Sequence, residues 1–194
     1  GTIEQIRSSW ILLDLLAELR LAKECTTTFI DMEPFEQADW VRAAVERLKP
    51  PPEDAVAVCV LDTGVNNGHP LISTALRDEH ILTSFPDKPL ADEEGHGTEM
   101  AGLALYGDLG PVVAGNDPIE LGHRLESVKI HPEADRPHPD LYGAVCLDAA
   151  MKIEAVAPER PRVFCMAITA NDNRDRGFPT SWSGELDRIT YGYP

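Results

Sequence analysis

The sequence predicts a three-layer α/β fold with a mostly parallel sheet. Short apolar runs typical of buried strands alternate with longer segments of helical periodicity over most of the chain. The run 55–61 contains no polar residue, as expected for a strand that helices cover on both faces. Strands that alternate with helices pair in parallel through right-handed crossovers, so we expect one sheet between two helical layers.

The composition indicates a folded domain with an acidic surface. The 194 residues are 43% hydrophobic and 26% charged, which is enough apolar material for a sizeable core. Acidic residues outnumber basic ones by 33 to 17, giving a formal charge of −16. Because such a charge repels phosphate backbones, we expect no nucleic-acid partner.

The cysteines favour a reduced protein. Cys25, Cys59, Cys146 and Cys165 show neither CxxC pairing nor metal-ligand spacing. Two of them lie in apolar runs, where a free thiol behaves as a small hydrophobe. We therefore expect a cytoplasmic location. The apolar stretch 10–21 is interrupted by charges and is too short to cross a bilayer, so we expect neither a membrane span nor a signal peptide there.

Residues 1–52 are predicted to form a helical accessory segment. Apolar residues repeat at helical spacing over 3–24 and again over 34–48. The three consecutive prolines at 50–52 end the second helix and mark a linker. A separate domain is expected over 53–194.

The elements of this domain follow from its periodicity and its turn residues. Strands are expected at 55–61, 80–85, 127–130 and 163–168, and helices at 70–77, 96–106 and 141–156. The polar stretch 178–184 is expected to lead into a further helix.

Two short motifs carry the candidate chemistry. Asp62-Thr63-Gly64 follows the first buried strand, at the carboxyl edge where α/β sheets bind ligands. On its own, this aspartate is more typical of a turn. Gly95-His96-Gly97-Thr98 opens a predicted helix, and its glycines allow close approach to the imidazole. An aspartate that orients a histidine, which takes and returns a hydroxyl proton, is the acid–base part of a serine-hydrolase triad.

These motifs resemble those of subtilisin-like serine proteases, peptidase family S8. The stretches 58–65 and 67–70 resemble the aspartate block, and 95–102 resembles the histidine block. Aspartate before histidine is the chain order of subtilisin rather than of chymotrypsin. The resemblance covers about residues 55–190 and implies an incomplete subtilisin-like domain.

The resemblance also implies roles for individual residues. Asp62 would orient His96, and His96 would be the general base and acid. The stretch 163–169 resembles the strand whose edge pairs with substrate, so Ala167, Ile168 and Thr169 would line the cleft. The family often has Ser-Leu-Gly there, and the bulkier Ala-Ile-Thr would reshape the specificity pocket.

No serine after His96 has the family's Gly-Thr-Ser setting. Ser127 lies in a predicted strand, and Ser181 and Ser183 lie at a predicted helix start, where serine usually caps. Ala114-Gly115-Asn116 precedes the 127–130 strand and is interpreted as a turn rather than an oxyanion site. The nucleophilic serine and the oxyanion asparagine are therefore expected downstream of this chain.

Three other functions remain as alternatives. Asp-Thr-Gly also occurs in aspartic proteases, which are mostly β and need either a second such loop or a dimer. His69, Glu93, Glu94 and His96 could be imagined as a metal cluster, although their spacing matches no common ligand pattern. The main alternative is an inactive fragment or pseudoprotease that binds a peptide or partner.

The sequence thus favours a serine endopeptidase that acts on a protein or peptide substrate. The rest of its own catalytic domain is a further expected partner, and no membrane partner is expected. No cofactor is expected, and no ligand pattern points to a structural calcium ion.

Overall fold

The structure is a computed structural model that describes residues 27–169 and 177–191. The chain separates into two compact units, residues 1–32 and 33–194. The described part of the first unit forms α3 (Thr27–Ile30). The helix predicted over 3–24 lies outside the described residues.

Four strands form the main sheet of the second unit. They are β2 (Ala57–Asp62), β3 (Ile81–Thr83), β5 (Arg124–Lys129) and β6 (Arg162–Cys165). Their order is β3-β5-β2-β6, and all neighbouring pairs are parallel. The predicted parallel sheet is confirmed, with the strand that ends at Asp62 in an inner position.

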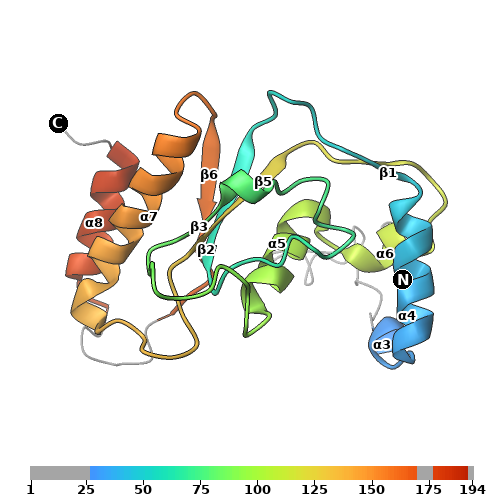
Figure 1. The fold of residues 1–194 in the computed structure, drawn as a ribbon, viewed down its shortest axis with the longest axis horizontal. Coiled ribbons are helices and arrows are strands. Elements are labelled where there is room, and N and C mark those ends of the chain that lie inside the picture. The colour runs from blue at the N-terminus through green and yellow to red at the C-terminus, as the bar shows by residue number, and fades with distance from the viewer. Residues whose placement is uncertain (1–26, 170–176, 192–194) are drawn as a thin grey trace, which may run out of the picture. The chain divides into compact units, whose positions relative to one another are not determined.

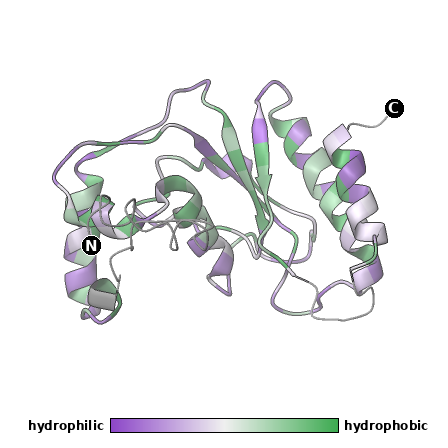
Figure 2. Cartoon of the chain, turned by 180° about the vertical axis from the view of Figure 1, so that it is seen from behind, coloured by the Kyte–Doolittle hydropathy of each residue, from purple (hydrophilic) through white to green (hydrophobic). Residues whose placement is uncertain are grey.

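Helices cover both faces of this sheet (Figure 1). The helix α5 (His96–Tyr106) lies on one face, and α7 (Tyr142–Val156) and α8 (Ser181–Tyr191) lie on the other. Alternate residues of β2 enter two separate cores: Val60 packs with the α5 side, and Leu61 packs with the α7 side. The three-layer α/β fold predicted from the sequence is therefore confirmed. In Figure 2, hydrophobic colouring runs along β2 and recurs on α5 and α7, whereas β5 carries mostly hydrophilic colouring.

The two helices on the α7 side pack closely against each other. A Cβ on Gly143 would lie 2.8 Å from Cγ of Glu185, so a larger residue there would push α8 away. The rings of Tyr142 and Trp182 meet edge to face, 5.1 Å apart. Two short 3-10 helices, η1 (Asp78–His80) and η2 (Pro139–Leu141), precede β3 and α7.

A small second sheet and two helices complete the unit. The strands β1 (Leu48–Lys49) and β4 (Ile119–Glu120) pair in parallel, and α4 (Pro34–Val45) contacts α6 (Leu109–Ala114). Arg47 joins these parts by donating to the carbonyl oxygens of Val112, Val113 and Asp117. The sequence did not predict α6, and α4 ends three residues before its predicted limit, since β1 begins at Leu48.

The helix predicted at 70–77 is wrong. Residues 70–75 form consecutive turns, in which the N–H groups of Ile72 and Ser73 both donate to His69 O. Leu71, Ile72 and Leu76 are all at most 3% exposed. Their spacing would also suit the apolar face of a helix, but the backbone hydrogen bonds close separate turns on His69 O and Ile72 O rather than a continuous helical ladder.

Buried charges explain why the sequence missed the start of β5. The strand β5 begins at Arg124, three residues before the predicted start, although it contains the fully buried Glu126. Glu126 accepts hydrogen bonds from Arg160 Nη1 at 3.2 Å and from Arg162 Nε at 2.9 Å. Paired charges can occupy a core, but a hydrophobicity pattern cannot show the pairing. The edge strand β6 ends at Cys165 rather than at the predicted 168, and the buried charges do not account for that limit.

Two composition-based expectations can be compared with the described residues. Cys59, Cys146 and Cys165 are free thiols. In the described ranges, every helix is too short or too polar to cross a membrane.

The core on the α7 side should make a large contribution to stability. Ile153 is 0% exposed, whereas Met151 on the same helix is 63% exposed. Ile153→Ala should lower the free energy of unfolding by about 2–5 kcal/mol, because it leaves a cavity. Met151→Ala should change it by less than about 0.5 kcal/mol. Urea unfolding measures both, and equal effects would contradict the assignment of this core.

Candidate active site

Asp62 and His96 are hydrogen-bonded to each other. They stand at the end of β2 and the start of α5, and His96 Nδ1 lies 2.8 Å from Asp62 Oδ1. The same oxygen accepts a 2.7 Å hydrogen bond from the Thr63 backbone N–H. The Asp62 side chain is 1% exposed and the His96 side chain is 44% exposed. The buried Asp62 carboxylate therefore holds the Nδ1 edge of the His96 imidazole, and solvent reaches the rest of the ring.

Two glycines allow this arrangement. A Cβ on Gly97 would overlap the carbonyl oxygen of Gly64 and lie 3.2 Å from Cβ of Asp62. Gly64 itself has a φ of +106°, and a Cβ there would lie 2.8 Å from Leu90 O. Because neither position tolerates a side chain, glycine at both lets the first turn of α5 rest on the turn after β2. This contact brings His96 to Asp62.

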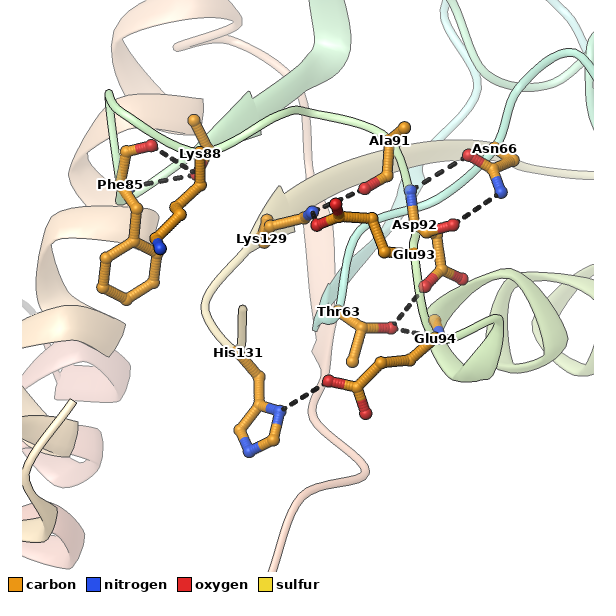
Figure 3. A network of polar contacts seen from close by, with 12 residues as sticks. Thr63, Asn66, Phe85, Lys88, Ala91, Asp92, Glu93, Glu94, Lys129 and His131 are labelled. Atoms are coloured by element: carbon orange, nitrogen blue, oxygen red, sulfur yellow. Dashed lines mark hydrogen bonds and ion pairs between the residues drawn. The ribbon is translucent and has the colours of Figure 1, made fainter. Parts of the chain in front are cut away.

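Asp92 holds the start of α5 in place. Its Oδ1 accepts hydrogen bonds from Thr63 Oγ1 and Gly95 N, both at 2.8 Å. Its Oδ2 accepts from Thr98 N at 2.8 Å and from Thr98 Oγ1 at 2.6 Å. Asn66 binds the backbone N–H and carbonyl of Asp92 with its side-chain amide (Figure 3). These donors include N–H groups of the helix start, which lack partners within the helix.

The hydrogen bonds to Asp92 favour its ionised form. Burial alone would raise the pKa of Asp92, but the donors from Thr98, Thr63 and Gly95 together hold the pKa below its usual value. The negative charge lies at the N-terminal end of α5, where the helix dipole also favours it. Thr63 Oγ1 in turn accepts from Gly97 N at 2.9 Å, so one network joins the Asp62 turn to the His96 helix.

A buried lysine supports the loop that carries Asp92. Lys129 ends β5 beside Asp62 in the sheet register, and its side chain is 1% exposed. Its Nζ donates to Ala91 O at 2.5 Å and lies 3.4 Å from Glu93 Oε2. Figure 3 shows Lys129 reaching from the strand to this loop. The residues on both sides of Asp92 are thus tied to the sheet.

The charges around His96 favour its protonated form. The hydrogen bond to Asp62 raises the pKa of His96 above its ordinary 6.5, partial burial opposes this, and the charges of Asp62, Glu99 and Asp92 add to the rise. Above that pKa, the neutral imidazole can accept a proton, and the Asp62 carboxylate then stabilises the imidazolium. This arrangement can perform general base and general acid catalysis.

The residues predicted to bind substrate follow β6 at the same edge of the sheet. Ala167 and Thr169 are exposed, and Ile168 is partly buried. Ile168 packs on the α7-side core and lines a small apolar hollow together with His131 and Trp182. Their predicted role in substrate binding stays a prediction.

The serines of the described residues have other structural settings. Ser127 lies in β5 at 0% exposure. Ser183 Oγ donates to Thr180 O at 2.9 Å and accepts from Thr180 N at 2.8 Å, which is a cap at the start of α8. Ser181 is the exposed first residue of that helix.

The imagined metal cluster does not form. His69 Nδ1 accepts from Leu71 N, Glu93 contacts Lys129, and Glu94 contacts Arg136. Within residues 27–169 and 177–191, no three His, Cys, Asp or Glu side chains are placed to share a metal ion.

Sequence reasoning missed Asp92 and Lys129. An aspartate shortly before a helix start is a recognisable capping signal, and Asp92 precedes Gly95-His96 by three residues. No comparable signal identifies Lys129. A lysine between Val128 and Ile130 gives no sign that its ammonium group binds a loop 38 positions away.

The contact at Gly97 can be tested against a second glycine of α5. Gly97→Ala should lower the free energy of unfolding by about 3 kcal/mol or more, because the added Cβ overlaps backbone. Gly102→Ala adds a Cβ with open space around it and should stabilise the helix by up to about 1 kcal/mol. Urea unfolding distinguishes them, and destabilisation of similar size in both variants would contradict the close approach.

The Asp62–His96 hydrogen bond can be tested by titration. Asp62→Asn removes the main cause of the raised pKa, so the pKa of His96 should fall, as measured by NMR on its Cε1 proton. Asp87→Asn, at an exposed loop position, is the control and should leave it unchanged. An unchanged pKa in Asp62→Asn would show that the pair does not interact.

The same pair should make stability depend on pH. A histidine whose folded pKa is raised contributes stability that is fully present below its unfolded pKa, near 6.5, and is lost as pH rises through the folded pKa. As pH rises from about 6.5 through the folded pKa of His96, the free energy of unfolding of wild type, measured with urea, should therefore fall relative to that of His96→Ala. Parallel stability curves for the two proteins would contradict the raised pKa.

Comparison with known proteins agrees with the geometry. The pattern that defines the subtilase family, peptidase family S8, matches residues 53–193, which include Asp62, His96 and the strands of the main sheet. No curated protein and no solved structure gave a significant match. The match confirms the resemblance inferred from the two motifs and covers well over half of the sequence. The chain belongs to the subtilase family of serine peptidases.

Proposed function

We propose that Asp62 and His96 serve the hydrolysis of peptide bonds by acyl transfer. His96 removes the proton from a serine hydroxyl as it attacks the scissile carbonyl and then gives a proton to the leaving amine. Asp62 holds the Nδ1 edge of the imidazole and stabilises the imidazolium. The 2.8 Å contact between a buried carboxylate and an accessible imidazole carries this proposal.

The nucleophile in this proposal comes from sequence outside this chain, as does the oxyanion donor. Ser127 is enclosed in a strand, and the Ser183 hydroxyl is engaged in a helix cap. A hydroxyl that already donates to a backbone carbonyl is poorly placed to donate to His96. These settings support an external serine, and they also favour the alternative of a peptide-binding module without turnover.

Activity-based labelling separates an external serine from an internal one. A fluorophosphonate probe should leave the 194-residue chain unlabelled and should label a serine in a protein extended beyond Pro194. Stoichiometric labelling of Ser181 or Ser183 in the chain itself would overturn the proposal of an external nucleophile.

Peptide turnover by the extended protein tests the role of His96. His96→Ala should remove nearly all turnover, a loss on the order of 10⁴-fold or more in kcat, because triad members act as a unit. His138→Ala is the control, since that side chain is 65% exposed on another loop. Unchanged turnover in His96→Ala would overturn the assignment, and absence of turnover in the wild-type extended protein would favour the binding module.

A further inference from the structure

Three consecutive acids precede the catalytic histidine, and the structure gives them different environments. Asp92 accepts four hydrogen bonds and is 7% exposed. Glu93 contacts the buried Lys129. Glu94 differs, because its partners lie across the site: His131, whose Nδ1 is 3.9 Å from Glu94 Oε1, and Arg136. Figure 3 shows Glu94 extending from the loop before α5 toward His131.

His131 connects Glu94 to both the catalytic pair and the predicted substrate cleft. Its backbone N–H donates to Asp62 O at 3.2 Å, so it stands directly beside the catalytic aspartate. Its side chain is 18% exposed and lines the apolar hollow that Ile168 and Trp182 also line. A substrate chain that passes His96 and Ile168 therefore meets the Glu94–His131 pair.

Arg136 indicates that the Glu94 carboxylate can bind a guanidinium group. Its Nη2 lies 3.2 Å from Oε1 and 3.3 Å from Oε2 of Glu94, and its side chain is 48% exposed. The Glu94 side chain is 26% exposed, and an ion pair that solvent reaches in this way contributes little to stability, so another cation can replace Arg136. The Arg136 guanidinium can therefore leave the Glu94 carboxylate. The partners of Asp92 are fixed in the turns around it, and the partner of Glu93 is the buried Lys129.

We propose that Glu94 and His131 form a subsite for a basic side chain of the substrate, close to the scissile bond, and that Arg136 fills this subsite when substrate is absent. The proposal rests on the proposed peptidase function and names its substrate class. A substrate arginine or lysine displaces Arg136 from the Glu94 carboxylate, and the His131 ring contacts its aliphatic stem. The formal charge of −16 favours the approach of such substrates.

Binding of two matched peptides tests the subsite on the 194-residue chain itself. The probes are fluorescein-labelled, alanine-rich octapeptides that differ only in one central residue, arginine or its uncharged analogue citrulline. By fluorescence anisotropy, the arginine peptide should bind about fivefold more tightly. Equal affinity of the two peptides, or no binding of either, overturns the proposal.

Variants identify the group responsible. Glu94→Gln should abolish the preference for arginine, whereas Glu133→Gln, which removes the same charge from an exposed position near His131, should retain it. Arg136→Gln should strengthen binding of the arginine peptide about threefold or more, because it removes the competing guanidinium. A preference that survives Glu94→Gln, or weaker binding in Arg136→Gln, overturns the proposal.

These measurements separate the subsite from the peptidase proposal. Absence of an arginine preference in the wild-type chain overturns the subsite even if the extended protein hydrolyses peptides. Absence of hydrolysis overturns the peptidase function and leaves the binding result standing.

Discussion

The contact between the first turn of α5 and the turn after β2 determines the geometry of the site. At this contact the backbone of Gly97 rests on Gly64 with no room for a side chain. Asp62 and His96 are 34 positions apart in the chain, and their hydrogen bond exists only while these two turns touch. Thr63 and Asp92 hold the turns together, and Lys129 ties the intervening loop to the sheet. The geometry of the Asp62–His96 pair thus depends on backbone packing together with these supporting hydrogen bonds.

Charge is used in two different ways in this protein. Glu126, Lys129 and Asp92 are buried, and their hydrogen bonds or ion pairs offset the cost of burial. The exposed Glu99 instead contributes to the electrostatics around His96, whose pKa its charge helps to raise. The formal charge of −16 does not distinguish these roles, because it counts buried and exposed carboxylates equally.

The sequence predicted the parts of the fold that depend on simple periodicity. The run before Asp62 became β2, and the helix expected at 96–106 forms with those limits. The chain order of the two motifs also indicated the family that the comparison shows. Failures arose where periodicity does not decide the structure: the residues at 70–75 have helical spacing but form turns, and β5 buries charged residues. The supporting roles of Asp92 and Lys129 depend on long-range contacts that spacing does not reveal.

The tautomer of the neutral His96 ring shows whether Asp62 orients the imidazole. If Asp62 orients the imidazole for base catalysis, the neutral ring carries its proton on Nδ1, facing the carboxylate, and leaves Nε2 free to accept a proton. Nitrogen-15 NMR of the imidazole above its pKa should therefore show a protonated Nδ1 and an unprotonated Nε2. A neutral ring protonated on Nε2 would contradict the account, because the nitrogen needed as the base would already hold its proton.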